Sequence, residues 1–150
     1  MVSLNQFAIT AMAGDMVYAP NRPQLSVRVG SGQSTPLVPG QVVKLSDVAS
    51  DIPVVVAAAV TDVPYGVVLR NERGTSFPAN SVCSIARDSD VVFMTAASAI
   101  VGGAQLQFTV GATVDDTATG GNKYIGKALT QAASGALVPV EIRCLAAMQA

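Results

Sequence analysis

The sequence predicts an all-β protein, a small single-domain β-barrel or β-tulip-like fold with an extended N-terminal arm. Short apolar stretches, many with period-two alternation, follow one another along most of the chain. Turn signals rich in Gly and Pro separate them, among them VPG, TDVPYG, NERG, VGG, DDTATGG and AASG. No stretch keeps a helical apolar period for more than about two turns. Many short strands joined by such turns are typical of a sandwich or a barrel.

Residues 1–36 are expected to form the arm. Four of the eight prolines fall within the first forty residues, together with the Gly/Ser cluster GSGQST. Between these breakers only QLSVRV alternates, with Leu25, Val27 and Val29 on one side. The segment has too little periodicity to build a core of its own, so residues 37–150 are expected to form the barrel domain.

Strand-like stretches run through this domain in the order QVVKLS, IPVVVAAAV, YGVVLR, SVCSIAR, DVVFMT, AQLQFTV, KYIGKALT and ALVPVEIR. The continuous apolar run at 52–60 fits a strand that is buried on both faces. Only the dipeptide DS separates residues 81–87 from residues 90–95, which predicts a hairpin at that point. Neither a second domain nor an internal repeat is visible.

The last strand has the clearest face assignment. One face carries Val138, Val140, Ile142 and Cys144, and the other carries Pro139, Glu141 and Arg143. The first set is predicted to lie in the core and the second to point outward.

The composition argues against nucleic-acid binding and against catalysis. The net charge is −1 and the nine basic residues are scattered, so no basic face is available to neutralise phosphates. Histidine is absent, which removes the commonest general base and the commonest transition-metal ligand. No G-x-S-x-G or S-x-x-K pattern marks a nucleophile. The sequence therefore predicts a protein that is not an enzyme, without catalytic residues and without a cofactor.

Three weaker features have plainer interpretations than a functional site. GSGQST lacks the lysine and the following helix of a phosphate-binding loop, and is interpreted as a linker. The aspartate pairs 88/90 and 115/116 could each supply half of a calcium site, but turn formation is the favoured interpretation and no metal is expected. Cys83 and Cys144 are expected to be buried, reduced thiols.

The surface is expected to be covered in part by partners. Only 13% of the residues are charged, against about 25% in a typical soluble domain. The remaining surface of Ala, Ser, Thr, Gly and Gln suits a protein covered by partners or by copies of itself, although a small apolar monomer would have the same composition. The N-terminus has no secretory signal, and the longest apolar run, Ile52 to Val60, falls short of the roughly 20 residues of a membrane helix. A soluble protein made in a cytoplasm, with no membrane partner, is expected.

Five short motifs, in this order and spacing, resemble the small capsid decoration (cement) proteins of tailed bacteriophages. They are a G-x-V-V strand at 40–43, GVV at 66–68, GA-x-L at 103–106, an IG-x-A-x-x-A-x-x-G stretch at 125–135 and V-x-V-x-I at 138–142. The resemblance covers roughly residues 37–145, and the Pro-rich arm departs from the shorter members of that family.

The resemblance implies a protein that binds the outer surface of an assembled phage head and stabilises it. Its implied partners are the major capsid protein and itself, as a homo-oligomer and most often a trimer, on virions assembled in a bacterial cytoplasm. The apolar side chains expected to contact the capsid or a neighbouring subunit are Phe7, Ile9, Met12, Met16, Tyr18, Leu25 and Val27.

Two other classes remain open at this point. One is another virion module, from the tail, the baseplate or the head-completion apparatus. The other is a small β-barrel that binds a ligand or works as a carboxylate-based enzyme, which would need an internal pocket lined by convergent polar groups. The predicted inward faces are almost wholly apolar, which disfavours the second class.

Overall fold

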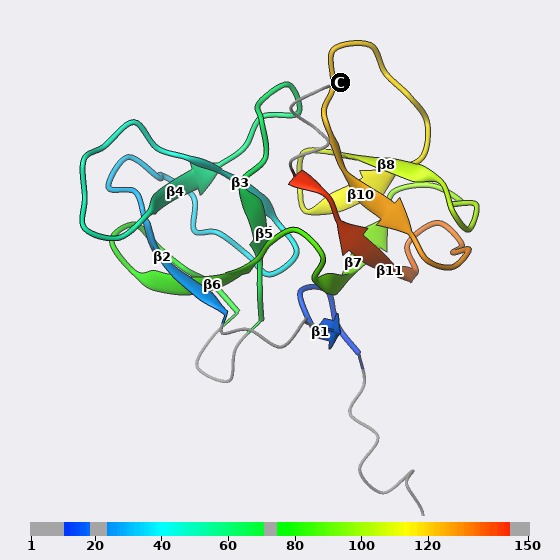
Figure 1. Cartoon of the computed structure of the whole chain (residues 1–150), viewed down its shortest axis with the longest axis horizontal. Coiled ribbons are helices and arrows are strands. Elements are labelled where there is room, and N and C mark those ends of the chain that lie inside the picture. Colours follow the sequence, from blue (N-terminus) through cyan, green and yellow to red (C-terminus); the bar gives the residue numbers. More distant parts are fainter. Residues whose placement is uncertain (1–10, 19–23, 71–74, 145–150) are drawn as a thin grey trace, which may run out of the picture.

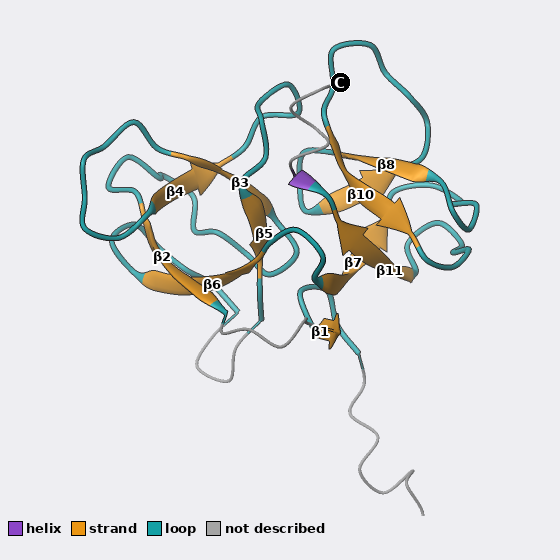
Figure 2. Cartoon of the chain, in the orientation of Figure 1, coloured by secondary structure: helices purple, strands orange, loops and turns teal. Residues whose placement is uncertain are grey.

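The computed structural model describes residues 11–18, 24–70 and 75–144 (Figure 1). The all-β class is confirmed, because nearly all regular structure in these residues is strand (Figure 2). None of the described segments forms a helix long and apolar enough to cross a bilayer. The described strands are β1 (Met16–Tyr18), β2 (Leu25–Val29), β3 (Val42–Leu45), β4 (Val54–Ala57), β5 (Gly66–Val68), β6 (Val82–Ala86), β7 (Val91–Ala96), β8 (Gln105–Phe108), β9 (Thr113–Asp115), β10 (Tyr124–Ala128) and β11 (Leu137–Ile142).

Within the described residues the strands close into two five-stranded barrels rather than one. Barrel 1 has the order β2-β4-β3-β5-β6 and closes where β6 pairs with β2. Barrel 2 has the order β7-β11-β10-β8-β9 and closes where β7 runs parallel to β9. The short strand β1 adds to β7 of barrel 2 from outside. Figure 1 shows the two barrels side by side.

The prediction of a hairpin between residues 81–87 and 90–95 is wrong, because the two strands do not pair with each other. Strand β6 pairs with β2 and β5 in barrel 1, whereas β7 pairs with β11, β9 and β1 in barrel 2. The short spacer turns the chain, with Ser89 at a φ of 75°. Because both edges of β6 are already taken within barrel 1, the chain crosses to the next barrel instead of folding back.

The two barrels share one topology, which corrects the expectation of a single barrel without an internal repeat. Each pairing among the strands β2 to β6 recurs between the corresponding strands β7 to β11, including the one parallel pair in each barrel, β2 with β4 and β7 with β9. The registers also agree, since Val43 faces Gly66 in barrel 1 and Leu106 faces Gly126 in barrel 2.

Loop details repeat in the same way. The backbone N–H of Gly40 donates to the carbonyl of Val68 at 2.8 Å, and the N–H of Gly103 donates to that of Ala128 at the same distance. Both glycines have a positive φ, of 87° and 85°. Barrel 2 is therefore a second copy of the barrel 1 fold, and the residues of the two copies can be matched one to one.

The core of barrel 1 is self-contained and consists of aliphatic side chains with one phenylalanine and one cysteine. It contains Val27, Val29, Leu37, Val43, Val55, Val68, Phe77, Cys83 and Ile85. The predicted inward face of the last strand is confirmed in the other barrel, where Val138, Val140 and Ile142 are fully buried and Cys144 nearly so.

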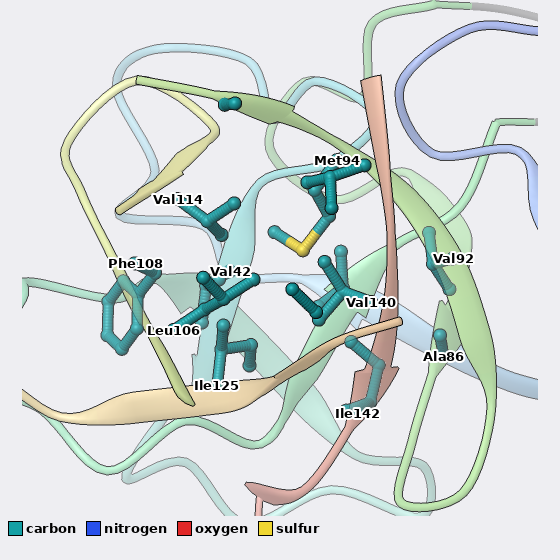
Figure 3. Packing of buried hydrophobic residues seen from close by; sticks show 14 of the residues in the cluster. Val42, Ala86, Val92, Met94, Leu106, Phe108, Val114, Ile125, Val140 and Ile142 are labelled. Carbon is teal, nitrogen blue, oxygen red and sulfur yellow. The ribbon is translucent and has the colours of Figure 1, made fainter. Parts of the chain in front are cut away.

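The core of barrel 2 extends across the contact between the barrels. Four buried residues on the outside of barrel 1 belong to the same apolar cluster: Val42, Val67, Leu69 and Ala86. Figure 3 shows Val42 among Leu106, Ile125 and Val140 of barrel 2. The outer β3-β5-β6 side of barrel 1, which we call the docking face, therefore covers one end of barrel 2.

The boundary of the arm lies elsewhere than the sequence suggested. Residues 24–29, taken as a strand-like patch within the arm, include β2, which closes barrel 1. Leu37 bridges to Phe77, so the intervening loop also belongs to the barrel. The described part of the arm outside barrel 1 is residues 11–18.

Candidate functional site

The segment 11–18 ties the two barrels together. The N–H of Gly14 donates to the carbonyl of Phe93 at 2.8 Å, and the N–H of Arg70 donates to the carbonyl of Gly14 at 3.0 Å. The Arg70 guanidinium also lies 3.4 Å from the Asp15 carboxylate. A side chain at position 14 would meet Pro39 at 2.5 Å, which explains the glycine. The segment is therefore a strap between the barrels, with contacts to both.

The described members of the seven predicted contact residues fall into two groups, one on the strap and one in strand β2 of barrel 1. Phe7 and Ile9 lie outside the described residues. Met12 is 48% exposed, while Met16 is partly buried against the barrel 2 cluster. Tyr18 pairs through its backbone with Val91.

Leu25 and Val27 lie in barrel 1, and the burial of Val27 corrects its assignment to a contact surface. Val27 is fully buried in the barrel core and Leu25 packs against that core. Their alternation reflects an inward strand face and not a surface awaiting a partner. On the strap, Val17, at 47% exposure, joins Met12 as an exposed apolar side chain.

One end of barrel 1 opens into a pocket of about 510 Å³. Its lining is Lys44, Leu45, Asp62, Val63, Pro64, Tyr65, Arg87, Asp88 and Cys144. Leu45 is 53% exposed although it ends a core strand. Sequence reasoning missed this pocket because its residues come from four separate places in the chain, and no local motif connects them.

The pocket lining combines apolar side chains with charged groups. The Lys44 ammonium lies 2.8 Å from the Asp62 carboxylate. This contact, together with the N–H of Ala59, holds the pKa of Asp62 below its usual value. The Arg87 guanidinium stacks over the Tyr65 ring at 5.1 Å from its centroid. The pocket can thus offer both apolar side chains and charges of both signs to a partner.

The carboxylates considered as metal ligands serve the backbone instead. Asp90 accepts from the N–H of Arg87 at 2.9 Å, and Asp88 accepts from the N–H of Cys144. Asp115 accepts from the Ser98 hydroxyl at 2.8 Å, and Asp116 from the N–H of Val101 at 3.1 Å. Across residues 11–18, 24–70 and 75–144, no three metal-ligating side chains gather at one point.

The two cysteines are free thiols, one in each apolar cluster. Burial raises the pKa of the Cys83 thiol to about 11. Burial, with a smaller contribution from the Asp88 carboxylate, raises the pKa of Cys144 to about 12. Neither thiol is poised as a nucleophile, because the thiolate is the reactive form.

We expect both thiols to react at least about a hundredfold more slowly with a chromogenic disulfide in the native protein than in urea, since each pKa unit is a tenfold loss of thiolate.

The raised pKa values of the two thiols also predict that the stability of the protein depends on pH. Unfolded thiols ionise near 9.0 while the folded ones stay protonated, so this stabilisation is complete below pH 9 and is lost between pH 9 and about 12. Thiol titration and urea melts test both points, with Cys83→Ala/Cys144→Ala expected to show a shallower decline. Rapid labelling of either thiol in the native protein would contradict the prediction.

Comparisons with known proteins give a fold relationship only. No family model matches the sequence, and no curated protein matches it. Among solved structures, the chain is similar to the N base of the head fibre gp8.5 of bacteriophage phi29, with a TM-score of 0.57 and 18% identity. The similarity covers 81% of this chain and 94% of the phi29 chain. At this identity the match establishes that the two chains share a fold.

Proposed function

We propose that this protein is a structural component of a phage head that binds the outer surface of the assembled capsid and stabilises it, as a decoration (cement) protein does. The observation that supports it best is the fold shared with nearly the whole N base of a phage head fibre. The major capsid protein is the proposed partner, and the protein is proposed to act as a homo-oligomer, a trimer, on the virion.

The chemistry of the chain is compatible with this role. A protein that binds an assembled shell better than its free subunits stabilises the shell by mass action and needs no reactive group. In the described part of the chain Asp90 and Asp115 are engaged in hydrogen bonds, and both thiols are buried. Exposed apolar residues on the strap, Met12 and Val17, supply a place for attachment.

The proposal is tested with purified heads that lack the protein. The wild-type chain is expected to saturate them and to raise the temperature at which they release DNA. Met12→Glu/Val17→Glu should bind about tenfold more weakly or worse, since it removes two apolar contacts and adds charge.

Val101→Glu, at another exposed valine, is the matched control and should bind normally. Failure of the wild-type chain to bind heads would overturn the proposal. Specific labelling of tails or baseplates by the same protein would move it to another virion module.

A further inference from the structure

The pocket of barrel 1 corresponds to the end of barrel 2 that the docking face covers. Phe108 pairs with Val114 in barrel 2 as Leu45 pairs with Val55 in barrel 1, so these two residues are counterparts. By the same matching, three residues at the covered end of barrel 2 have counterparts that line the pocket of barrel 1. Phe108 corresponds to Leu45, Ile125 to Tyr65, and Ile142 to Arg87.

Burial differs sharply between these matched positions. The three residues of barrel 2 are at most 1% exposed and share a cluster with the docking face of barrel 1. In barrel 1, Leu45 and Arg87 are exposed and Tyr65 is half-buried. The same end of the same fold is thus covered in one barrel, whereas in the other no described segment covers it.

The docking face shows the opposite difference. In barrel 1 its residues are buried against barrel 2: Val42, Val67, Leu69 and Ala86. The counterparts in barrel 2 are exposed or partly exposed: Gln105, Lys127, Leu129 and Glu141. We call this second set the free face. Among the residues that the structure describes, each half of the contact between the barrels is therefore occupied once and left open once.

A contact whose two halves differ can be repeated head to tail between copies. We propose that the free face of one copy of this chain docks into the pocket of barrel 1 of a second copy, repeating the contact that joins the two barrels within each chain. The inference rests on the proposed self-association and names the surfaces that make it. It is independent of how the protein attaches to a head.

The residues of the two surfaces fit such a contact. Leu129, 45% exposed, can pack against Leu45 and Val63, the exposed apolar side chains of the pocket lining. Lys127 can lay its aliphatic stem on these side chains and bring its ammonium near the carboxylates of Asp62 and Asp88, which also line the pocket. The free face is more polar than the docking face, as is usual for a contact that forms after folding.

The test uses two variants of exposed residues that should fold normally, Leu45→Asp in the pocket and Leu129→Asp on the free face. In sedimentation velocity the wild-type chain is expected to associate as concentration rises, and each variant alone to stay monomeric. An equimolar mixture of the two should form 1:1 dimers, because each variant keeps the surface that the other needs. Recovery on mixing is specific to a head-to-tail contact.

Val101→Glu should associate like the wild type, and melting curves should confirm that all variants are folded. A mixture that stays monomeric would overturn the inference, as would normal association of either single variant. A pocket filled from within the same chain would leave the wild type monomeric even at millimolar concentration, which would also overturn it. A wild-type chain that binds heads without self-association would refute this contact and leave the proposed attachment intact.

Discussion

Replacement of Gly126 by alanine is expected to lower the free energy of unfolding by on the order of 3–5 kcal/mol. A Cβ atom at this position would lie 2.1 Å from the carbonyl oxygen of Glu141, a backbone atom of the neighbouring strand. Since Gly126 lies in β10 and pairs with Ile142 of β11, relief of the clash would require these two strands to separate. Urea denaturation followed by circular dichroism measures the change.

Gly32→Ala and Gly120→Ala are the matched controls, because a Cβ atom at either position would have no neighbour within 4 Å. Both should unfold within about 1 kcal/mol of the wild type. Gly66→Ala, the counterpart of Gly126 in barrel 1, should be costly too, since its Cβ would lie 2.6 Å from the carbonyl of Ala86. Wild-type stability of Gly126→Ala would show that the strands are less closely paired at this point than the structure indicates.

These two glycines illustrate what the sequence could and could not reveal about the repeat. Strand positions were predictable because inward side chains alternate, and the last strand was assigned correctly. The repeat was not, because matched positions share a steric requirement and seldom a residue type. Val67 and Lys127 occupy the same position in the fold, yet one is buried between the barrels and the other is exposed.

The shortest strands were the other elements that could not be predicted from the sequence. β1 and β9 have three residues each, too few to display a period of two. β9 also overlaps the run DDTATGG, whose turn character was the stronger local signal. Both strands exist because β7 offers them a partner edge, and such a long-range pairing leaves no trace in the local sequence.

The candidate surfaces show the same limit. Met12 was predicted as a contact residue and is exposed, whereas Val27 was predicted with it and is buried. Both lie in the first 36 residues, where apolar side chains are scattered without a sustained period, so composition could not separate them. The pocket depends on which barrel end the partner barrel covers, and that is a property of the packing between the barrels.

The packing between the barrels leads to the last prediction, which compares the stability of the protein with an aspartate at each of two matched positions. Val67→Asp should destabilise the protein by several kcal/mol, roughly, because it places an unpaired carboxylate in the apolar contact between the barrels. Lys127→Asp puts the same side chain at the matched position of barrel 2, where it is exposed, and should change stability by about 0.5 kcal/mol or less in dilute solution. Thermal and urea unfolding of both variants measure the difference. Because both variants place the same side chain at matched backbone positions, a large difference between their free energies of unfolding measures the effect of burial at the docking face. Equal stability of the two variants would mean that the barrels do not pack through this face.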